Sequence, residues 1–208
     1  MERGGADPVR VRVRAGDQAP AAAPVPPVAL TGHIPGVFAL SDLLNPARKA
    51  RWFWPVLATL VLTDCSTKEL VVSELAGRPG PHPVLGEWVR LNLAYNDGAA
   101  MNLSFGGASR LVFSSVAVGA IALLLVLYYR TRPDAALRAG ALALLAGGAL
   151  GNLLDRLHSA RGVVDFIDIG VGDARFWTFN LADVGVTAGA ILLAVALWRE
   201  DGVPRSSA

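Results

Sequence analysis

The sequence has little of several things that common functional classes need. Cys65 is its single cysteine, which excludes an internal disulfide, and the apolar run around it predicts a buried, unreactive thiol. His82 and His158 have no second histidine or cysteine nearby, which argues against a metal site, so we expect no metal or other cofactor. No serine has a plausible histidine base, which disfavours a serine hydrolase. A formal net charge of only +2 argues against a nucleic-acid partner.

Apolar residues are abundant and clustered. They make up 53% of the chain, and the mean hydropathy is +0.44. Such values predict a membrane protein rather than a soluble domain. Residues 1–45 differ, being rich in proline, alanine and glycine with scattered arginines, and we expect a disordered tail. Residues 1–27 lack the apolar stretch of a signal peptide, so no cleaved leader is expected.

The apolar residues fall into four segments that predict an all-α membrane domain over residues 46–200. The predicted helices cover residues 52–72, 111–129, 139–154 and 181–198. Helix 139–154 is short, and its glycines indicate close packing against another helix. Residues 88–95 alternate in polarity, which predicts a short strand between the first two helices.

Basic residues predict the orientation of these helices. They lie before the first helix, between the second and third, and after the fourth: Arg48, Lys49, Arg51, Arg130, Arg132, Arg138 and Arg199. With four spans these positions share one side, which the positive-inside rule assigns to the cytoplasm. Both termini, including residues 201–208, would then be cytoplasmic. The segments of about 73–110 and 155–180 would lie on the outer face.

Polar residues gather at the predicted outer ends of the helices and in the outer segments. Ionisable groups near a membrane core are costly, so they suggest a functional site. The set consists of Asp64, Lys68, Asn96, Asn152, Asp155, Arg156, Asp165, Asn180 and Asp183.

Each of these positions also has a purely structural interpretation. Asp64 and Lys68, four residues apart, could neutralise each other on one helix face or line a polar cleft. Asn180 and Asp183 have the spacing of a helix cap. Asp165 could be a solvated loop acid, although its apolar neighbours argue against free solvation.

The end of the predicted helix 139–154 also has two interpretations. Asn152, Asp155 and Arg156 share one helix face. They could end the helix with an acid–base pair, or they could position a substrate backbone or a neighbouring carboxylate.

Two aspartates held close together cannot both ionise easily, so they share a proton. The ionised partner can activate water for attack on a peptide carbonyl, while the protonated partner donates to the carbonyl oxygen. This chemistry needs neither metal nor cofactor.

Several sequence blocks resemble the signature blocks of lipoprotein signal peptidases (signal peptidase II). They are Asp64-Cys-Ser-Thr-Lys68, Asn96-Asp-Gly-Ala-Ala100, Gly151-Asn-Leu-Leu-Asp-Arg156, Val163-Val-Asp-Phe166 and Phe179-Asn-Leu-Ala-Asp183. The blocks follow the family's order and spacing over about residues 52–198.

The resemblance implies an aspartic endopeptidase of the bacterial inner membrane, and nothing in the sequence requires more than a monomer. Its substrate would be a diacylglyceryl-modified prolipoprotein, cut just before the lipidated cysteine, with membrane lipid around it and cyclic peptides such as globomycin as inhibitors. Asp165 and Asp183 correspond to the family's catalytic pair. The implied positioning residues are Asp64, Lys68, Asn96, Asn152, Asp155, Arg156 and Asn180. The family fold implies a small outer β-cradle and a short outer helix in the segment before the last span.

The chain departs from the family pattern at two places that shape the cleft. Met101 replaces a usual phenylalanine, and Phe176-Trp-Thr-Phe179 lacks a common proline. Gly98 and Gly106-Gly107 suggest a mobile flap. Two other functions remain open: a non-enzymatic membrane subunit or assembly factor, and a lipid-modifying transferase. The transferase would more naturally carry a histidine or a cationic cluster, and the subunit leaves the paired aspartates unexplained.

Overall fold

The computed structural model describes residue 1 and residues 48–98 and 108–201. The predicted disordered tail after Met1, the positions Met101 and Gly106-Gly107, and residues 202–208 lie outside the described part of the chain.

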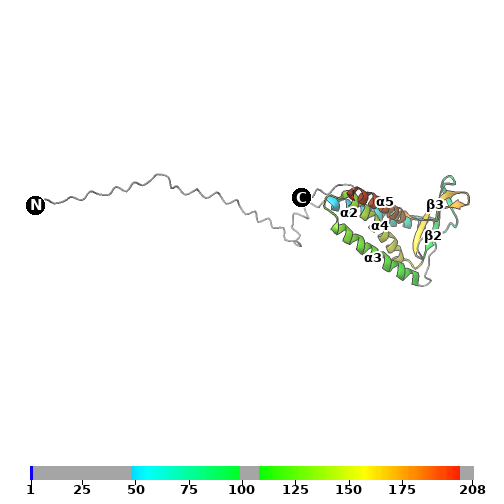
Figure 1. Ribbon diagram of the computed structural model, residues 1–208. Coiled ribbons are helices and arrows are strands. Elements are labelled where there is room, and N and C mark those ends of the chain that lie inside the picture. The colour runs from blue at the N-terminus through cyan, green and yellow to red at the C-terminus, as the bar shows by residue number, and fades with distance from the viewer. Residues whose placement is uncertain (2–47, 99–107, 202–208) are drawn as a thin grey trace. The chain divides into compact units, whose positions relative to one another are not determined.

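Four helices form the main body of the part that the structure describes (Figure 1). They are α2 (Arg48–Leu75), α3 (Ser109–Arg130), α4 (Ala136–His158) and α5 (Leu181–Asp201). Each contains the apolar stretch predicted for it and extends that stretch at one or both ends. Helix α4 packs against the other three. Its small residues allow this, since a side chain added at Gly148 would collide with the Ala182 carbonyl of α5.

Three of these helices are long and apolar enough to cross a membrane. They are α3, α4 and residues 181–199 of α5. Helix α2 carries Asp64, Lys68 and Glu69 within its length, which lowers its hydropathy. The helices and the small sheet are therefore confirmed, while the count of four spans stays a prediction.

A small antiparallel sheet lies at one end of the helices (Figure 1). Its order is β1 (His82–Leu85), β2 (Val89–Asn96), β3 (Val163–Val171) and β4 (Ala174–Arg175). Strand β2 matches the strand predicted for residues 88–95.

The prediction of a short helix between α4 and α5 is wrong. Residues 159–180 form β3, β4 and connecting turns. The reason is local: Val163-Val-Asp-Phe-Ile-Asp-Ile169 is rich in β-branched and aromatic residues, which favour a strand. Strand β2 also offers β3 an antiparallel partner between Val163 and Ile169, with Tyr95 opposite Val164.

Two apolar clusters hold the helices and the sheet together. One contains Phe53, Tyr128 and Leu142 and joins α2, α3 and α4 near the cytoplasmic end predicted for them. The other contains Val71, Leu75 and Phe166 and joins the end of α2 to the sheet. Burial of such side chains is the main stabilising term, at roughly 25 cal/mol per Å² of apolar surface. The polar site lies between the two clusters.

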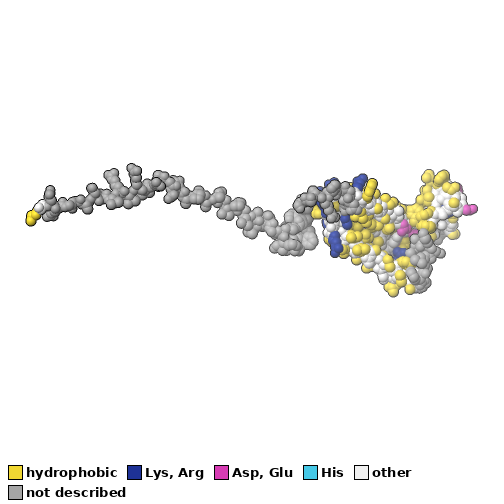
Figure 2. All heavy atoms as spheres, viewed as in Figure 1, with side chains coloured by type: hydrophobic (Ala, Val, Ile, Leu, Met, Phe, Trp, Pro, Cys, Tyr) yellow, Lys and Arg dark blue, Asp and Glu magenta, His cyan; other side chains and the backbone are white. Residues whose placement is uncertain are grey.

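The two ends of the helices differ in surface charge. Figure 2 shows hydrophobic side chains over the helices, and Lys and Arg side chains gathered at the helix ends that lie away from the sheet. This basic end contains Arg48, Lys49 and Arg51 at the start of α2 and Arg130 at the end of α3.

Candidate active site

Asp165 reaches the site from β3. It pairs with Ala94 of β2, so Asn96 lies on the same face, two residues along. The Asn96 side chain donates to Asp165 Oδ2 (3.2 Å), and the Asn180 side chain donates to Oδ1 (2.6 Å). Asp165 is 5% exposed. A free, solvated loop acid is therefore the wrong interpretation of this residue.

Asp183 reaches the same site from the first turn of α5. Asn180 Oδ1 accepts from the Asp183 backbone N–H (3.0 Å), and Asp183 Oδ2 accepts from the Asn180 N–H (3.2 Å). This is a reciprocal capping box, so the capping interpretation is right. It does not remove Asp183 from the site, because Oδ1 accepts from the Asn152 side chain of α4 (2.9 Å).

Backbone pairing brings the start of α5 to β3. The Phe179 N–H donates to the Ile167 carbonyl (3.0 Å), and the Phe179 carbonyl accepts from the N–H groups of Phe166 and Ile167. Asn180, the cap of α5, is thereby held beside the strand that carries Asp165. This pairing explains how Asp165 on β3 and Asp183 in the first turn of α5 come to share one site.

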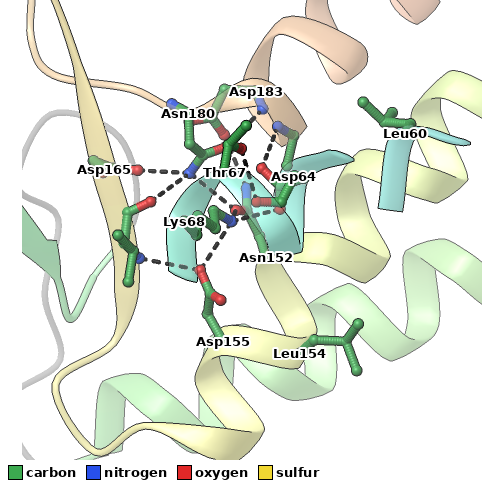
Figure 3. A network of polar contacts seen from close by, with 12 residues as sticks. Leu60, Asp64, Thr67, Lys68, Asn152, Leu154, Asp155, Asp165, Asn180 and Asp183 are labelled. Carbon is green, nitrogen blue, oxygen red and sulfur yellow. Dashed lines mark hydrogen bonds and ion pairs between the residues drawn. The ribbon is translucent and has the colours of Figure 1, made fainter. Parts of the chain in front are cut away.

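Asn152 and Asn180 join the two carboxylates (Figure 3). The Asn180 Nδ2 group donates to Asp165 Oδ1, to Asn152 Oδ1 (3.1 Å) and to the Val164 carbonyl (3.2 Å). Asn180 is fully buried. Each aspartate thus accepts from an asparagine amide, and the two asparagines contact each other.

Beneath this network Lys68 contacts two further carboxylates (Figure 3). Its Nζ lies 2.7 Å from Asp64 and 2.8 Å from Asp155, and it donates to Asn152 Oδ1 (3.0 Å). Lys68 is 3% exposed and Asp64 is fully buried. Buried charges need such pairing, because an unpaired one would be very costly.

The same two carboxylates hold the backbone beside each aspartate. Asp64 Oδ1 accepts from the N–H of Ala182, the residue before Asp183 (2.9 Å). Asp155 Oδ2 accepts from the N–H of Val164, the residue before Asp165 (3.1 Å). Lys68 therefore stands between two matching supports, one for each aspartate. Asp64, Lys68 and Asp155 are absent from the residues that line the cavity, so a cleft-wall role for Asp64 and Lys68 is not what the geometry shows.

Arg156 borders the site from the end of α4. Its guanidinium donates to the Gly98 carbonyl (2.9 Å) and to the Asn152 carbonyl (3.2 Å), and it lies over the Phe113 ring of α3. Arg156 lines the cavity described below. Arg156 is therefore the cation of the site that faces the cavity, whereas Lys68 contacts buried partners.

The surroundings of Asp165 raise its pKa to about 6. Burial is the largest cause, because it disfavours the charged form, and the nearby Asp183 carboxylate adds to it. The hydrogen bonds from Asn96 and Asn180 act in the opposite direction and are outweighed. Such a displaced pKa beside a second carboxylate is typical of an acid–base pair.

Both aspartates open onto one cavity of about 700 Å³. Its polar end contains Asn96, Asn152, Arg156, Asp165 and Asp183. The rest of the lining is mainly apolar: Val163, Phe176, Trp177, Thr178, Phe179, Val184, Val186, Thr187, Ala188 and Ile191. Asn180 lies behind the wall and supports it. The apolar lining was not predicted from the sequence, although Phe176-Trp-Thr-Phe179, where the chain departs from the family pattern, forms part of it.

The described residues offer no arrangement suited to a metal ion. No group of three or more His, Cys, Asp or Glu side chains within residues 48–98 and 108–201 is placed to hold one. The carboxylates near the aspartate pair are instead bound to Lys68 and to backbone N–H groups.

Comparison with known proteins identifies the family. A family model described as signal peptidase (SPase) II matches residues 56–199. The chain belongs to the signal peptidase II family. The predicted resemblance is thereby confirmed, and the family is one of membrane proteases.

Curated relatives agree with this assignment. The lipoprotein signal peptidase of Klebsiella pneumoniae subsp. pneumoniae is 44% identical over 151 residues, covering 69% of this chain and 85% of the relative. That of Salmonella paratyphi A is 42% identical over 147 residues, with the same coverage of both proteins.

Solved structures share the fold. One described as "Bacterial membrane enzyme structure by the in meso method at 2.3 A resolution" is 25% identical with a TM-score of 0.63, covering 74% of this chain and 91% of that one. A second, at 1.9 Å, is 26% identical with a TM-score of 0.58, covering 73% and 92%.

Proposed function

We propose that this signal peptidase II family member is an aspartic endopeptidase. It removes the signal peptide from diacylglyceryl-modified bacterial prolipoproteins, cutting before the lipidated cysteine. The observation that carries the proposal is the pair Asp165 and Asp183, which come from different elements, open onto one cavity and are joined through Asn152 and Asn180.

The environments of the two aspartates suggest their roles. Asp165, with its raised pKa, carries the shared proton and donates it to the carbonyl oxygen of the scissile bond. Asp183 is the base that takes a proton from the attacking water. It returns that proton to the leaving amine as the tetrahedral intermediate collapses, and Asp165 recovers its own. The apolar walls exclude bulk water and strengthen these interactions.

The amide network fixes this geometry. The side-chain amides of Asn96 and Asn180 hold the two oxygens of Asp165, and Asn152 holds Asp183. Asp64, Lys68 and Asp155 act one layer further away as positioning residues. Arg156 supplies the charge that orients the substrate at the polar end of the cavity.

The surface supports a four-span orientation in the inner membrane. Helix α2 is the fourth span, because its internal charges Asp64 and Lys68 neutralise each other at 2.7 Å. The basic helix ends face the cytoplasm with both termini, and the sheet and the aspartates lie near the outer face. Cyclic peptide inhibitors such as globomycin would occupy the same cavity. In this proposal the enzyme acts as a monomer surrounded by lipid.

The decisive experiment measures cleavage of a purified diacylglyceryl-modified prolipoprotein by the detergent-solubilised protein. Asp165→Asn and Asp183→Asn should each lower kcat/KM by about 10²- to 10⁴-fold, because each removes one half of the acid–base pair. Asp173→Asn, on the exposed turn between β3 and β4, is the matched control and should cleave normally.

Folding is checked separately by thermal unfolding of the same samples. Cleavage by a folded Asp165→Asn protein at the parental rate would exclude the aspartic mechanism. A folded parent protein that leaves authentic substrate intact would favour a non-enzymatic membrane subunit instead.

A further inference from the structure

The apolar wall of the cavity contains an aromatic segment, Phe176–Phe179, that has no part in the proton transfers. Trp177 is half exposed (50%) and lines the cavity together with Phe176, Thr178 and Phe179. The Phe176 and Trp177 rings are 4.3 Å apart, and Phe176 meets Phe179 edge-on. Large exposed aromatic side chains in a cavity are the common anchors of bound apolar groups.

Strand β3 holds this aromatic segment at both ends. The Phe176 N–H donates to the Ile169 carbonyl (2.8 Å), and the Phe179 N–H donates to the Ile167 carbonyl (3.0 Å). Trp177 therefore projects from a short span whose two ends are fixed to the strand that carries Asp165. Its position relative to Asp165 is set by the backbone, so the indole is preorganised to contact a substrate held at the aspartates.

The lining continues from the aromatic segment along one side of α5. Val184, Ala188 and Ile191 line the cavity at successive turns of that helix, and Ile191 is 61% exposed. Helix α5 is one of the three helices apolar enough to cross a membrane. The cavity lining thus combines the polar aspartates with the exposed Trp177 and with apolar side chains of a helix that is apolar enough to cross a membrane.

The chemistry of this lining distinguishes its occupants. After Thr187 in the sequence, the described α5 residues that line the cavity are Ala188 and Ile191, and neither has a polar side chain. An extended peptide there would leave its N–H and C=O groups without partners, which is strongly unfavourable in an apolar environment. Hydrocarbon chains have no such groups, and the adjacent lipid-facing surface lets them extend into the bilayer.

We propose that Trp177 is a specificity-determining residue that contacts the acyl chains of the substrate's diacylglyceryl group. The inference rests on the proposed function, because it takes the lipidated cysteine as the group next to the scissile bond. The indole covers the chains at the point where they leave the polar end of the cavity. Phe176 supports the indole from one side, and the α5 side chains provide the opposite wall.

The test compares Trp177→Ala with the parent on two prolipoprotein substrates, one with long acyl chains and one with short chains. On the long-chain substrate KM should rise about five- to tenfold with kcat nearly unchanged, since the loss is one of apolar contact. On the short-chain substrate the two proteins should have the same KM. Trp198→Ala is the matched control, since Trp198 lies at the other end of α5 and is 79% exposed.

Three results would overturn the inference while leaving the proposed function intact. They are an unchanged KM on both substrates, an equal rise on both, which would assign Trp177 to the peptide, and an equal rise in Trp198→Ala. Trp177→Phe keeps an aromatic ring, so its KM should still depend on acyl-chain length almost as it does in the parent. This variant keeps the inference testable if Trp177→Ala does not fold. Failure of the parent to cleave either substrate would instead contradict the proposed function.

Discussion

Asp165 and Asp168 lie three residues apart on β3, yet their surroundings shift their pKa values in opposite directions. Burial and the Asp183 charge raise the pKa of Asp165. Burial also acts to raise the pKa of Asp168, but hydrogen bonds from Arg175 and Arg90 outweigh it, and the net pKa of Asp168 is lowered. Because side chains alternate along a strand, the two carboxylates face different sides of the sheet. On one strand, therefore, the charged form of the carboxylate facing the cavity is destabilised, and the charged form of the carboxylate facing the two arginines is stabilised.

The raised pKa of Asp165 predicts how stability depends on pH. Between 3.8 and about 6 the folded protein keeps a proton at Asp165 that the unfolded chain has lost, so the free energy of unfolding falls as pH rises through this window. In Asp165→Asn this fall should be absent. Relative to the parent, the variant should gain on the order of 2 to 3 kcal/mol between about pH 4 and pH 6.5.

Denaturant titrations in detergent at several pH values measure this difference. Asp168→Asn provides a comparison of opposite sign, because the stability from a lowered pKa is present above 3.8 and is lost as pH falls. Parallel stability curves for the parent and Asp165→Asn would contradict the prediction.

The sequence predicted the chemistry of individual residues better than their contacts. It grouped Asp165, Asp183, Asn152 and Asn180 at one depth, and the structure brings these four together. It could not show that Lys68 turns away from the cavity to Asp155, since that depends on how α2 packs against α4. The family roles of these residues remain a proposal, which the cleavage experiment tests.

At the scale of elements, the small sheet is held together by Arg90 and Arg175 around the buried Asp168. Arg90 donates to Asp168 Oδ2 from β2, and Arg175 donates to Asp168 Oδ1 from β4. Arg175 also donates to the carbonyls of Asp168 and Glu87. The sequence did not predict these contacts, because they depend on the pairing of Arg90 with Asp168. That pairing follows from a shift in the β2–β3 register between Leu91 and Ala94. Hydrophobic alternation alone does not locate such a bulge.

Arg175→Ala should loosen the segment that follows it. The change removes hydrogen bonds at the residue before Phe176 and leaves Asp168 with a single arginine, at a cost of about 2 to 4 kcal/mol in stability. We expect KM to rise more than kcat falls, because Asn96 and Asn180 still hold Asp165.

Amide hydrogen exchange at Phe176 and Phe179 reports the loosening directly and should be faster in the variant. Arg78→Ala removes a surface arginine whose side chain is exposed, and it should change neither the exchange nor KM. Unaltered exchange in Arg175→Ala would show that β4 does not depend on this fastening.

At the scale of the whole molecule, the separation of charge along the helices predicts the orientation. Four spans put the α3–α4 connection, with Arg132, on the cytoplasmic side, and the β3–β4 turn, with Asp173, on the outer side. The sequence predicts this arrangement because hydropathy and basic flanks are local signals. It could not supply the status of α2, where the charged network of the site interrupts the apolar run.

Single cysteines introduced into a Cys65→Ala protein test this orientation. In intact spheroplasts a membrane-impermeant maleimide should label Asp173→Cys at once and Arg132→Cys only after the membrane is opened. Both positions are exposed, so access differs only through the membrane. Labelling of both from the outside would require an even number of spans between them and would contradict the four-span arrangement, in which α4 alone separates the two positions.

The bond between Asp64 and the Ala182 N–H joins residues that are 118 positions apart in the chain. During synthesis α2 emerges long before α5, and N-terminal segments fold first at the ribosome. Until α5 arrives, Asp64 has Lys68 as a neighbour on its own helix, which shields both charges during insertion. The site therefore cannot assemble before the last helix is made, so a growing or truncated chain carries no complete aspartate pair and, under the proposed aspartic mechanism, has no proteolytic activity towards its neighbours.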